Sequence, residues 1–248
     1  MINVAETCVG TRALGPGLRS VVWVQGCPFR CRGCVAPDWI PFREARRVAP
    51  DELADELLAD PDVTGLTLSG GEPMEQAAGL ADLVRAARAR RELSVICFTG
   101  YRRAELAGRA EAAALLAEVD VLIDGRYVAS RNDDRGLRGS ANQRVHHLTG
   151  RLAGAAEELA GGPRRAEVRV RGGEALLVGV PPRALSEGFA RAREGTAREG
   201  TARAREGTAR KGTARAREGT TRGPGGGTGG GEGFTGTVRE GTSGEESR

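Results

Sequence analysis

Short apolar runs alternate with amphipathic segments over roughly the first 180 residues, and this alternation predicts an α/β fold. The clearest strand-like runs are residues 18–25, 63–68, 93–98 and 119–123. Weaker strand patterns cover residues 2–5, 145–148, 166–171 and 175–180, of which the last two suggest a hairpin. Helical spacing of apolar residues predicts helices that begin near residue 49, at 74–91 and at 104–117. Because strands and helices alternate, we expect parallel βα units arranged as an open, partial TIM-like barrel.

The sequence changes character after residue 182. Residues 183–248 are built mainly of Ala, Arg, Glu, Gly and Thr in near-repeats such as RAREGTA, with very few bulky apolar side chains. Such a composition cannot bury enough surface to offset the entropy of the chain. We therefore expect one folded domain over residues 1–182 and a disordered, low-complexity tail over residues 183–248.

The charge belongs to the tail. The chain has a formal net charge of +4, and the 13 basic and 9 acidic residues of 183–248 account for all of it, which leaves 24 of each sign in residues 1–182. A neutral folded domain gives no reason to expect a nucleic-acid partner. No apolar segment approaches the roughly 20 residues that a membrane span needs, and the N-terminus lacks a signal pattern, so we expect a cytoplasmic protein.

Three of the five cysteines form the most informative motif. Cys27, Cys31 and Cys34 have C-x₃-C-x₂-C spacing directly after a predicted strand that ends at Gly26. Thiolates ligate metals and iron–sulfur clusters, and three on one loop can converge on one centre. A structural zinc site would need a fourth ligand, such as Cys8, Cys97 or a histidine, whereas a four-iron cluster on three thiolates leaves one iron open. Cys8 and Cys97 are otherwise expected to be ordinary buried residues.

Other polar or glycine-rich motifs follow the predicted strands. Residues 69–73 read Ser-Gly-Gly-Glu-Pro, residues 99–101 read Thr-Gly-Tyr, and Asp124 and Arg126 follow the run at 119–123. Active sites of α/β proteins collect at the carboxyl ends of strands. The plainer alternatives are a strand-to-helix turn at residues 69–73 and a solvated strand end at Asp124. His146 and His147 alternate across a predicted strand and are expected to be structural.

These motifs together resemble the radical S-adenosylmethionine superfamily, and within it the activating proteins of anaerobic (class III) ribonucleotide reductase. The resemblance rests on GPGLRSVVWVQGCPFRCRGC (residues 15–34) and LSGGEP (68–73), and continues through CFTGY (97–101), DGRY (124–127) and RGSANQR (138–144). Superfamily members often carry an aromatic residue where this chain has Gly33, but this branch tolerates glycine there. The resemblance covers about residues 1–180, and it leaves the role of residues 138–144 open.

The resemblance implies a cluster, a cofactor and a reaction. Cys27, Cys31 and Cys34 would hold a [4Fe–4S] cluster. The implied S-adenosylmethionine-binding residues are Gly33, Val35, Ser69, Gly70, Gly71, Glu72, Thr99, Asp124 and Arg126. The enzyme would cleave S-adenosylmethionine reductively and place a glycyl radical on class III ribonucleotide reductase, with flavodoxin or ferredoxin as electron donor. Two alternatives stay open: a radical enzyme with another substrate, and a non-catalytic iron–sulfur or zinc module tethered by its tail.

Overall fold

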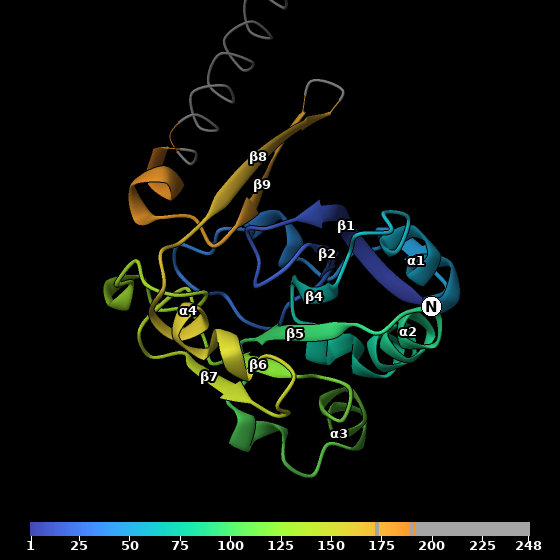
Figure 1. Cartoon of the computed structure of the whole chain (residues 1–248). Helices are drawn as coiled ribbons and strands as arrows, with labels where there is room; N and C mark the ends of the chain where they lie inside the picture. The colour runs from blue at the N-terminus through green and yellow to red at the C-terminus, as the bar shows by residue number, and fades with distance from the viewer. Residues whose placement is uncertain (172–173, 189–190, 192–248) are drawn as a thin grey trace, which may run out of the picture. The chain divides into compact units, whose positions relative to one another are not determined.

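Seven strands form one mixed sheet in the computed structural model, which describes residues 1–171, 174–188 and 191 (Figure 1). The order across the sheet is β3-β1-β2-β4-β5-β6-β7. The strands are β1 (Ile2–Thr11), β2 (Arg19–Val24), β3 (Arg46–Val48), β4 (Gly65–Gly70), β5 (Ser94–Thr99), β6 (Val121–Asp124) and β7 (Arg144–His147). The four central strands β2, β4, β5 and β6 run parallel, whereas β1, β3 and β7 pair antiparallel with their neighbours.

The predicted parallel βα units are therefore confirmed for the centre of the sheet and wrong for its edges. Strand β1 pairs antiparallel with β2, and at the other edge β7 pairs antiparallel with β6. Among the described residues no pairing joins β3 to β7, so the sheet is open. Its central strands still place their carboxyl ends along one edge, which is the feature that positions the site.

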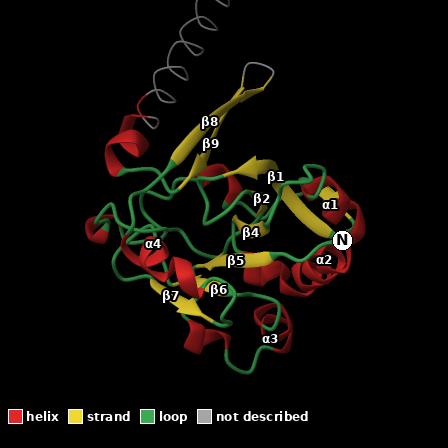
Figure 2. Ribbon diagram, in the orientation of Figure 1, coloured by secondary structure: helices red, strands yellow, loops and turns green. Residues whose placement is uncertain are grey.

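Helices cover the sheet on both faces (Figures 1 and 2). The α-helices are α1 (Pro50–Leu57), α2 (Ala77–Arg90), α3 (Ala110–Leu116) and α4 (Ala156–Gly161). The first three helices share one apolar core with the strands. This core contains Leu53, Leu83 and Leu115 together with the side chains of β4 and β5 that face these helices. Leu159 of α4 packs on the opposite face against Ile96, Val121 and Ile123. None of the described helices is long and apolar enough to cross a membrane.

Two predicted helices are shorter than their apolar pattern. The segment predicted at residues 74–91 begins as a 3₁₀ helix (Pro73–Gln76) before α2. The segment predicted at 104–117 divides into a 3₁₀ turn (Arg103–Leu106) and α3. Gly108 separates these two pieces with φ of +80°, a conformation that an α-helix cannot contain.

The predicted hairpin is present as β8 (Ala166–Arg171) and β9 (Glu174–Gly179), paired antiparallel. Val178 and Leu176 of β9 pack with Val21 and Trp23 of β2, so the hairpin base covers part of the inner face of the sheet. Residues 183–188, at the start of the predicted tail, are helical. The rest of the predicted tail, apart from residue 191, lies outside the described residues.

A buried arginine ties together the opposite, amino-terminal end of the central strands. Arg19 of β2 is fully buried. Its guanidinium donates to Thr67 Oγ1 (2.8 Å), Ser94 Oγ (2.9 Å) and the carbonyls of Pro16 (3.1 Å), Leu66 (2.5 Å) and Ser94 (3.0 Å). All five N–H groups thus have an acceptor. Burial lowers the pKa of Arg19 to about 9, partly offset by Asp120, so the side chain stays charged at neutral pH.

We predict that Arg19→Lys destabilises the protein by about 2–4 kcal/mol, because an ammonium has three donors and would leave buried acceptors unpaired. Urea unfolding followed by circular dichroism measures the effect. The matched control is Arg90→Lys, whose partly exposed side chain pairs with Asp51 and Asp55 on the surface of α1. That substitution should leave the urea midpoint close to the wild-type value, because exposed ion pairs contribute little to stability. Equal effects of both substitutions would contradict the structural role of Arg19.

Candidate metal centre

Backbone hydrogen bonds join the carboxyl ends of the central strands to one another. Gly71 N donates to Val24 O (2.7 Å) and Glu72 N donates to Gly26 O (2.8 Å), which fixes the turn after β4 to the end of β2. Gly125 N, after β6, donates to Tyr101 O, after β5 (2.9 Å). The Ser-Gly-Gly-Glu-Pro motif is therefore fixed beside the cysteine motif, and the turn after β6 beside the Thr-Gly-Tyr motif.

The Glu72 carboxylate connects the turn after β4 to β5. It accepts hydrogen bonds from Met74 N (3.0 Å), Thr99 Oγ1 (2.7 Å) and Gly100 N (2.7 Å), and the residue is 1% exposed. Burial raises the pKa of Glu72 to about 7, although the three donors oppose this shift. The sequence predicts Glu72 as a cofactor-binding residue, and the structure places its side chain inward, bonded to the protein, with Thr99 as one of its partners.

Glycine is required at several points of this edge by close packing. A Cβ at Gly70 would lie 2.2 Å from Val24 N, and one at Gly71 would lie 2.2 Å from Gly26 O. A Cβ at Gly100 would lie 2.5 Å from the Phe29 ring. The approach of backbone to backbone therefore accounts for Gly70 and Gly71 without a ligand.

The cysteine loop leaves β2 at Gly26, which has φ of +98°. It is held by a returning segment, because Gly26 N donates to Trp39 O and Cys27 N donates to Ile40 O, both at 2.9 Å. The side chain of Gln25 adds a bond from Nε2 to Pro41 O (2.7 Å). Both ends of the loop are thus anchored to the same strand end.

The three thiols are free and partly buried. Burial raises the pKa of Cys27 to about 11 and raises that of Cys34 above its ordinary value. Backbone N–H groups of Phe29 and Ala36 hydrogen-bond these two sulfurs and oppose the shift. A metal that binds here must displace the thiol protons, and the N–H groups would then stabilise the thiolates.

The type of donor fits an iron–sulfur cluster. Three thiols belong to one short loop, and two of them receive hydrogen bonds from backbone N–H groups. In the described part of the chain, no group of three or more His, Cys, Asp or Glu side chains is gathered to hold a metal ion. Cys97, a residue of β5, is buried in the core that the sheet shares with α1, α2 and α3, and Cys8 is buried with Val21 and Trp23.

Aromatic residues of the sequence motifs pack around the cysteine loop, to which Phe29 itself belongs. The Phe29 ring packs edge-on against Tyr101 at 4.7 Å between centroids, and the Arg126 guanidinium lies over Phe29 at 4.6 Å. On the other side, a Cβ at Gly33 would lie 3.6 Å from the Tyr127 ring. Neighbouring Val35 is 56% exposed. Local spacing could not reveal these contacts, because each joins residues far apart in the sequence.

Asp124 and Arg126 do not pair with each other. Asp124 Oδ2 accepts a hydrogen bond from Arg103 N (2.6 Å) and lies 3.1 Å from His146 Nε2, which places His146 in a supporting position on β7. Arg126 extends over Phe29, with Glu105 Oε1 at 3.8 Å. Ser69, the remaining predicted residue, is half-buried and in register with Trp23 of β2.

The Arg-Gly-Ser-Ala-Asn-Gln-Arg segment, which had no assigned role, fastens the turn after β6. Gln143 Nε2 donates to Gly125 O (2.7 Å), and Asn142 Nδ2 donates to Arg126 O (2.8 Å). Gln143 Oε1 accepts from Gly139 N (2.8 Å), while buried Ser140 accepts from Val128 N (3.1 Å). The polar residues of this segment thus form a second layer behind Arg126.

We predict a pH dependence of stability that belongs to Glu72. Its folded-state pKa of about 7 lies above the ordinary value of 4.5, so its stabilising contribution is complete below pH 4.5 and is lost as the pH rises through about 7. Between pH 5.5 and 8 the metal-free protein should lose about 2 kcal/mol through this group.

Urea unfolding at a series of pH values measures this loss. In Glu72→Gln the free energy of unfolding should no longer fall over this pH range. In Glu52→Gln, a change on the exposed side of α1, it should fall with pH as in wild type. Parallel slopes for wild type and Glu72→Gln would show that Glu72 does not titrate in this range.

Comparison with known proteins agrees with this arrangement. Residues 13–146 match the family model of the 4Fe-4S single cluster domain. An anaerobic ribonucleoside-triphosphate reductase-activating protein of Vibrio cholerae is 37% identical over 145 residues, which covers 54% of this chain and 91% of the relative. Proteins of the same name are 32% identical in Escherichia coli K12 (54% and 91% covered) and 33% identical in Enterobacteria phage T4 (53% and 85%).

The family match spans the cysteine loop and all four central strands, and the relatives are covered over most of their length. The chain therefore belongs to the family of anaerobic ribonucleoside-triphosphate reductase-activating proteins, with a 4Fe-4S single cluster domain.

Proposed function

We propose that this protein activates an anaerobic ribonucleotide reductase by generating a glycyl radical on it. The observation that carries the proposal is the fixed position of three free thiols at the carboxyl edge of the parallel strands, bonded through Gly26 to the Gly-Gly-Glu-Pro turn. Cys27, Cys31 and Cys34 would hold a [4Fe–4S] cluster there. The names of the relatives support the partner, since each is described as activating the anaerobic reductase.

The bound cofactors would supply one-electron cleavage of S-adenosylmethionine to methionine and a 5′-deoxyadenosyl radical, which takes a hydrogen atom from a glycine Cα of the partner. The chain's own task is to hold and orient them. Thiols of raised pKa must give up their protons to the solvent when the cluster binds. Once ligated, Cys27 and Cys34 keep the backbone N–H groups of Phe29 and Ala36 as hydrogen-bond donors.

The proposed contacts with S-adenosylmethionine divide by position. Gly33 and Val35 lie on the cysteine loop. Ser69 and Gly70 end β4, Gly71 follows it, and Arg126 follows β6. For these residues we propose direct contact through backbone groups or exposed side-chain atoms. The carboxylates of Glu72 and Asp124 and the hydroxyl of Thr99 already bond within the protein. For these three we propose support of the cofactor site through the backbone they fix.

The same proposal includes an external one-electron donor of the flavodoxin or ferredoxin type and a cytoplasmic location. We also propose that the open sheet is a partial TIM-type barrel of the radical S-adenosylmethionine kind. The activity would reside in residues 1–182. The competitors of this proposal are a radical enzyme with another substrate and a non-catalytic iron–sulfur or zinc module. Neither competitor is favoured by a specific contact.

We predict that anaerobic reconstitution with iron and sulfide yields about four irons per chain, and that Cys31→Ala loses most of this iron and the reduced-cluster signal in electron paramagnetic resonance. Cys97→Ala is the matched control, because Cys97 is a free cysteine in the core. It should retain the cluster, with at most a modest loss of stability from the small cavity.

Addition of S-adenosylmethionine should change the signal of the reduced wild-type cluster, because an iron held by three thiolates has an open coordination position. Retention of stoichiometric zinc with no cluster would contradict the proposed enzymatic function and favour a non-catalytic zinc-binding module. A cluster whose signal is insensitive to S-adenosylmethionine would contradict the proposed cofactor.

A further inference from the structure

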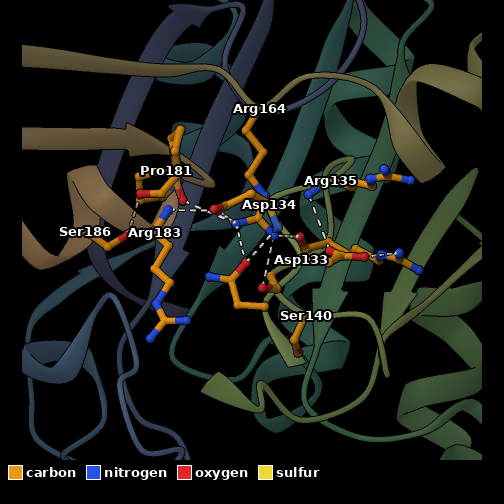
Figure 3. Close-up of polar contacts among 12 residues, drawn as sticks. Asp133, Asp134, Arg135, Ser140, Arg164, Pro181, Arg183 and Ser186 are labelled. Atoms are coloured by element: carbon orange, nitrogen blue, oxygen red, sulfur yellow. Dashed lines mark hydrogen bonds and ion pairs between the residues drawn. The ribbon is translucent and has the colours of Figure 1, made fainter. Parts of the chain in front are cut away.

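A second buried arginine lies outside the site, between the C-terminal segment and the loop after β6 (Figure 3). The Arg164 side chain is 1% exposed. It donates to Asn132 Oδ1 (2.8 Å), Asp134 Oδ1 (3.1 Å) and the carbonyls of Arg138 (2.7 Å), Gly139 (3.0 Å) and Pro181 (3.4 Å). One guanidinium thus connects three stretches of chain that are separated in sequence.

Asp134 is positioned to receive this arginine. It has φ of +56°, a left-handed conformation that aspartate tolerates better than most residues, and its backbone N–H donates to Asn132 Oδ1 (3.1 Å). The same Asp134 Oδ1 accepts the N–H of Arg183 (2.8 Å). The loop is also held by backbone bonds from Gly136 and Leu137 to the end of α4.

Two short routes lead from Arg164 to the cysteine loop. The first passes through Gly139, whose carbonyl accepts from Arg164 and where a Cβ would lie 3.0 Å from the Tyr127 ring. The Gly139 N–H also donates to Gln143, the residue that fixes Gly125. The second passes through Asn132, whose amide donates to the Tyr127 hydroxyl (3.4 Å).

Tyr127 lies where the two routes meet. Its ring lies against Gly33, between Cys31 and Cys34, and also against Gly139, where a Cβ would lie 3.0 Å from the ring. Any shift of the 132–139 loop therefore acts on Tyr127, and through it on the part of the cysteine loop that carries two of the three thiols.

We propose that Arg164 is a positioning residue, which fixes Tyr127 and Gly139 as the outer wall of the cysteine loop. Arg164 lies beyond residues 13–146, where the family match ends, so this support comes from a part of the chain that the family domain does not include. The link to the cluster rests on the proposed function, whereas the link to the loop is a property of the protein itself.

Lysine cannot replace this arginine. An ammonium has three donors at one point, whereas the five N–H groups of a guanidinium point in different directions within one plane and can reach acceptors that lie apart. Arg164→Lys keeps the charge and much of the volume but loses the connection between Gly139 and Asn132. The matched control is Arg165→Lys, because the neighbouring Arg165 side chain is exposed and lies 3.6 Å from Glu158 on the surface.

The first measurement is hydrogen–deuterium exchange of the full-length, cluster-free chain. In Arg164→Lys, amides of residues 127–143 should exchange at least tenfold faster, while those of β4 and β5 keep the wild-type rate. Exchange that rises only in residues 174–188 would show that Arg164 holds the C-terminal segment alone and would overturn the proposal. Arg164→Gln, which is neutral, repeats the test if the lysine variant unfolds.

The second measurement is the rate of cluster loss to a chelator in reconstituted protein. Arg164→Lys should lose its cluster about five- to tenfold faster than wild type or Arg165→Lys, with a change in the reduced-cluster spectrum. Equal rates in all three would overturn the link to the cysteine loop. If wild type assembles no cluster, the proposed function fails, but the exchange measurement still decides whether Arg164 fixes the loop.

Discussion

The hydrogen bonds of the Glu72 carboxylate are the interaction on which the proposed site depends. A buried carboxylate is costly, and here the cost is partly offset by three donors that come from its own turn and from the end of β5. The backbone N–H of the same residue bonds Gly26, immediately before Cys27. One residue thereby sets the positions of the ends of β2, β4 and β5 relative to each other. The absence of side chains at Gly71 and Gly100 follows from this close approach.

The site is built in layers outward from that carboxylate. The cysteine loop lies against it, and Phe29 and Tyr101 pack over the loop. Behind the turn after β6, Asn142 and Gln143 fasten the backbone at Gly125 and Arg126, and Arg164 fastens the next loop. The cysteine loop itself contains no regular strand or helix over residues 27–36, so its geometry depends on these neighbours. Polar side chains bonded to backbone atoms therefore supply the order that regular secondary structure supplies elsewhere.

The sequence predicted the central strands, the hairpin and the cysteine loop well, because each has a strong local signal. Continuous apolar runs mark buried parallel strands, and three cysteines on one loop have few structural explanations. Strand β3 escaped prediction because Arg46-Arg47-Val48 has no strand pattern and is defined only by pairing with β1. Arg19 would be expected on a surface, and its burial is explained by five neutral acceptors, four of which lie 47 or more residues away in the sequence. The inward direction of Glu72 was also hidden, since the motif alone cannot say what a carboxylate faces.

The most direct test of the central claim is the transfer of a radical to the partner. Reconstituted protein would be incubated anaerobically with a one-electron reductant, S-adenosylmethionine and a purified class III ribonucleotide reductase, and the reductase would be examined by electron paramagnetic resonance. We expect a glycyl-radical signal on the reductase, with 5′-deoxyadenosine formed at least in equal amount, and neither product with Cys31→Ala. Formation of 5′-deoxyadenosine without a glycyl radical would indicate a different substrate. Absence of both from a cluster-loaded wild-type protein would contradict the account.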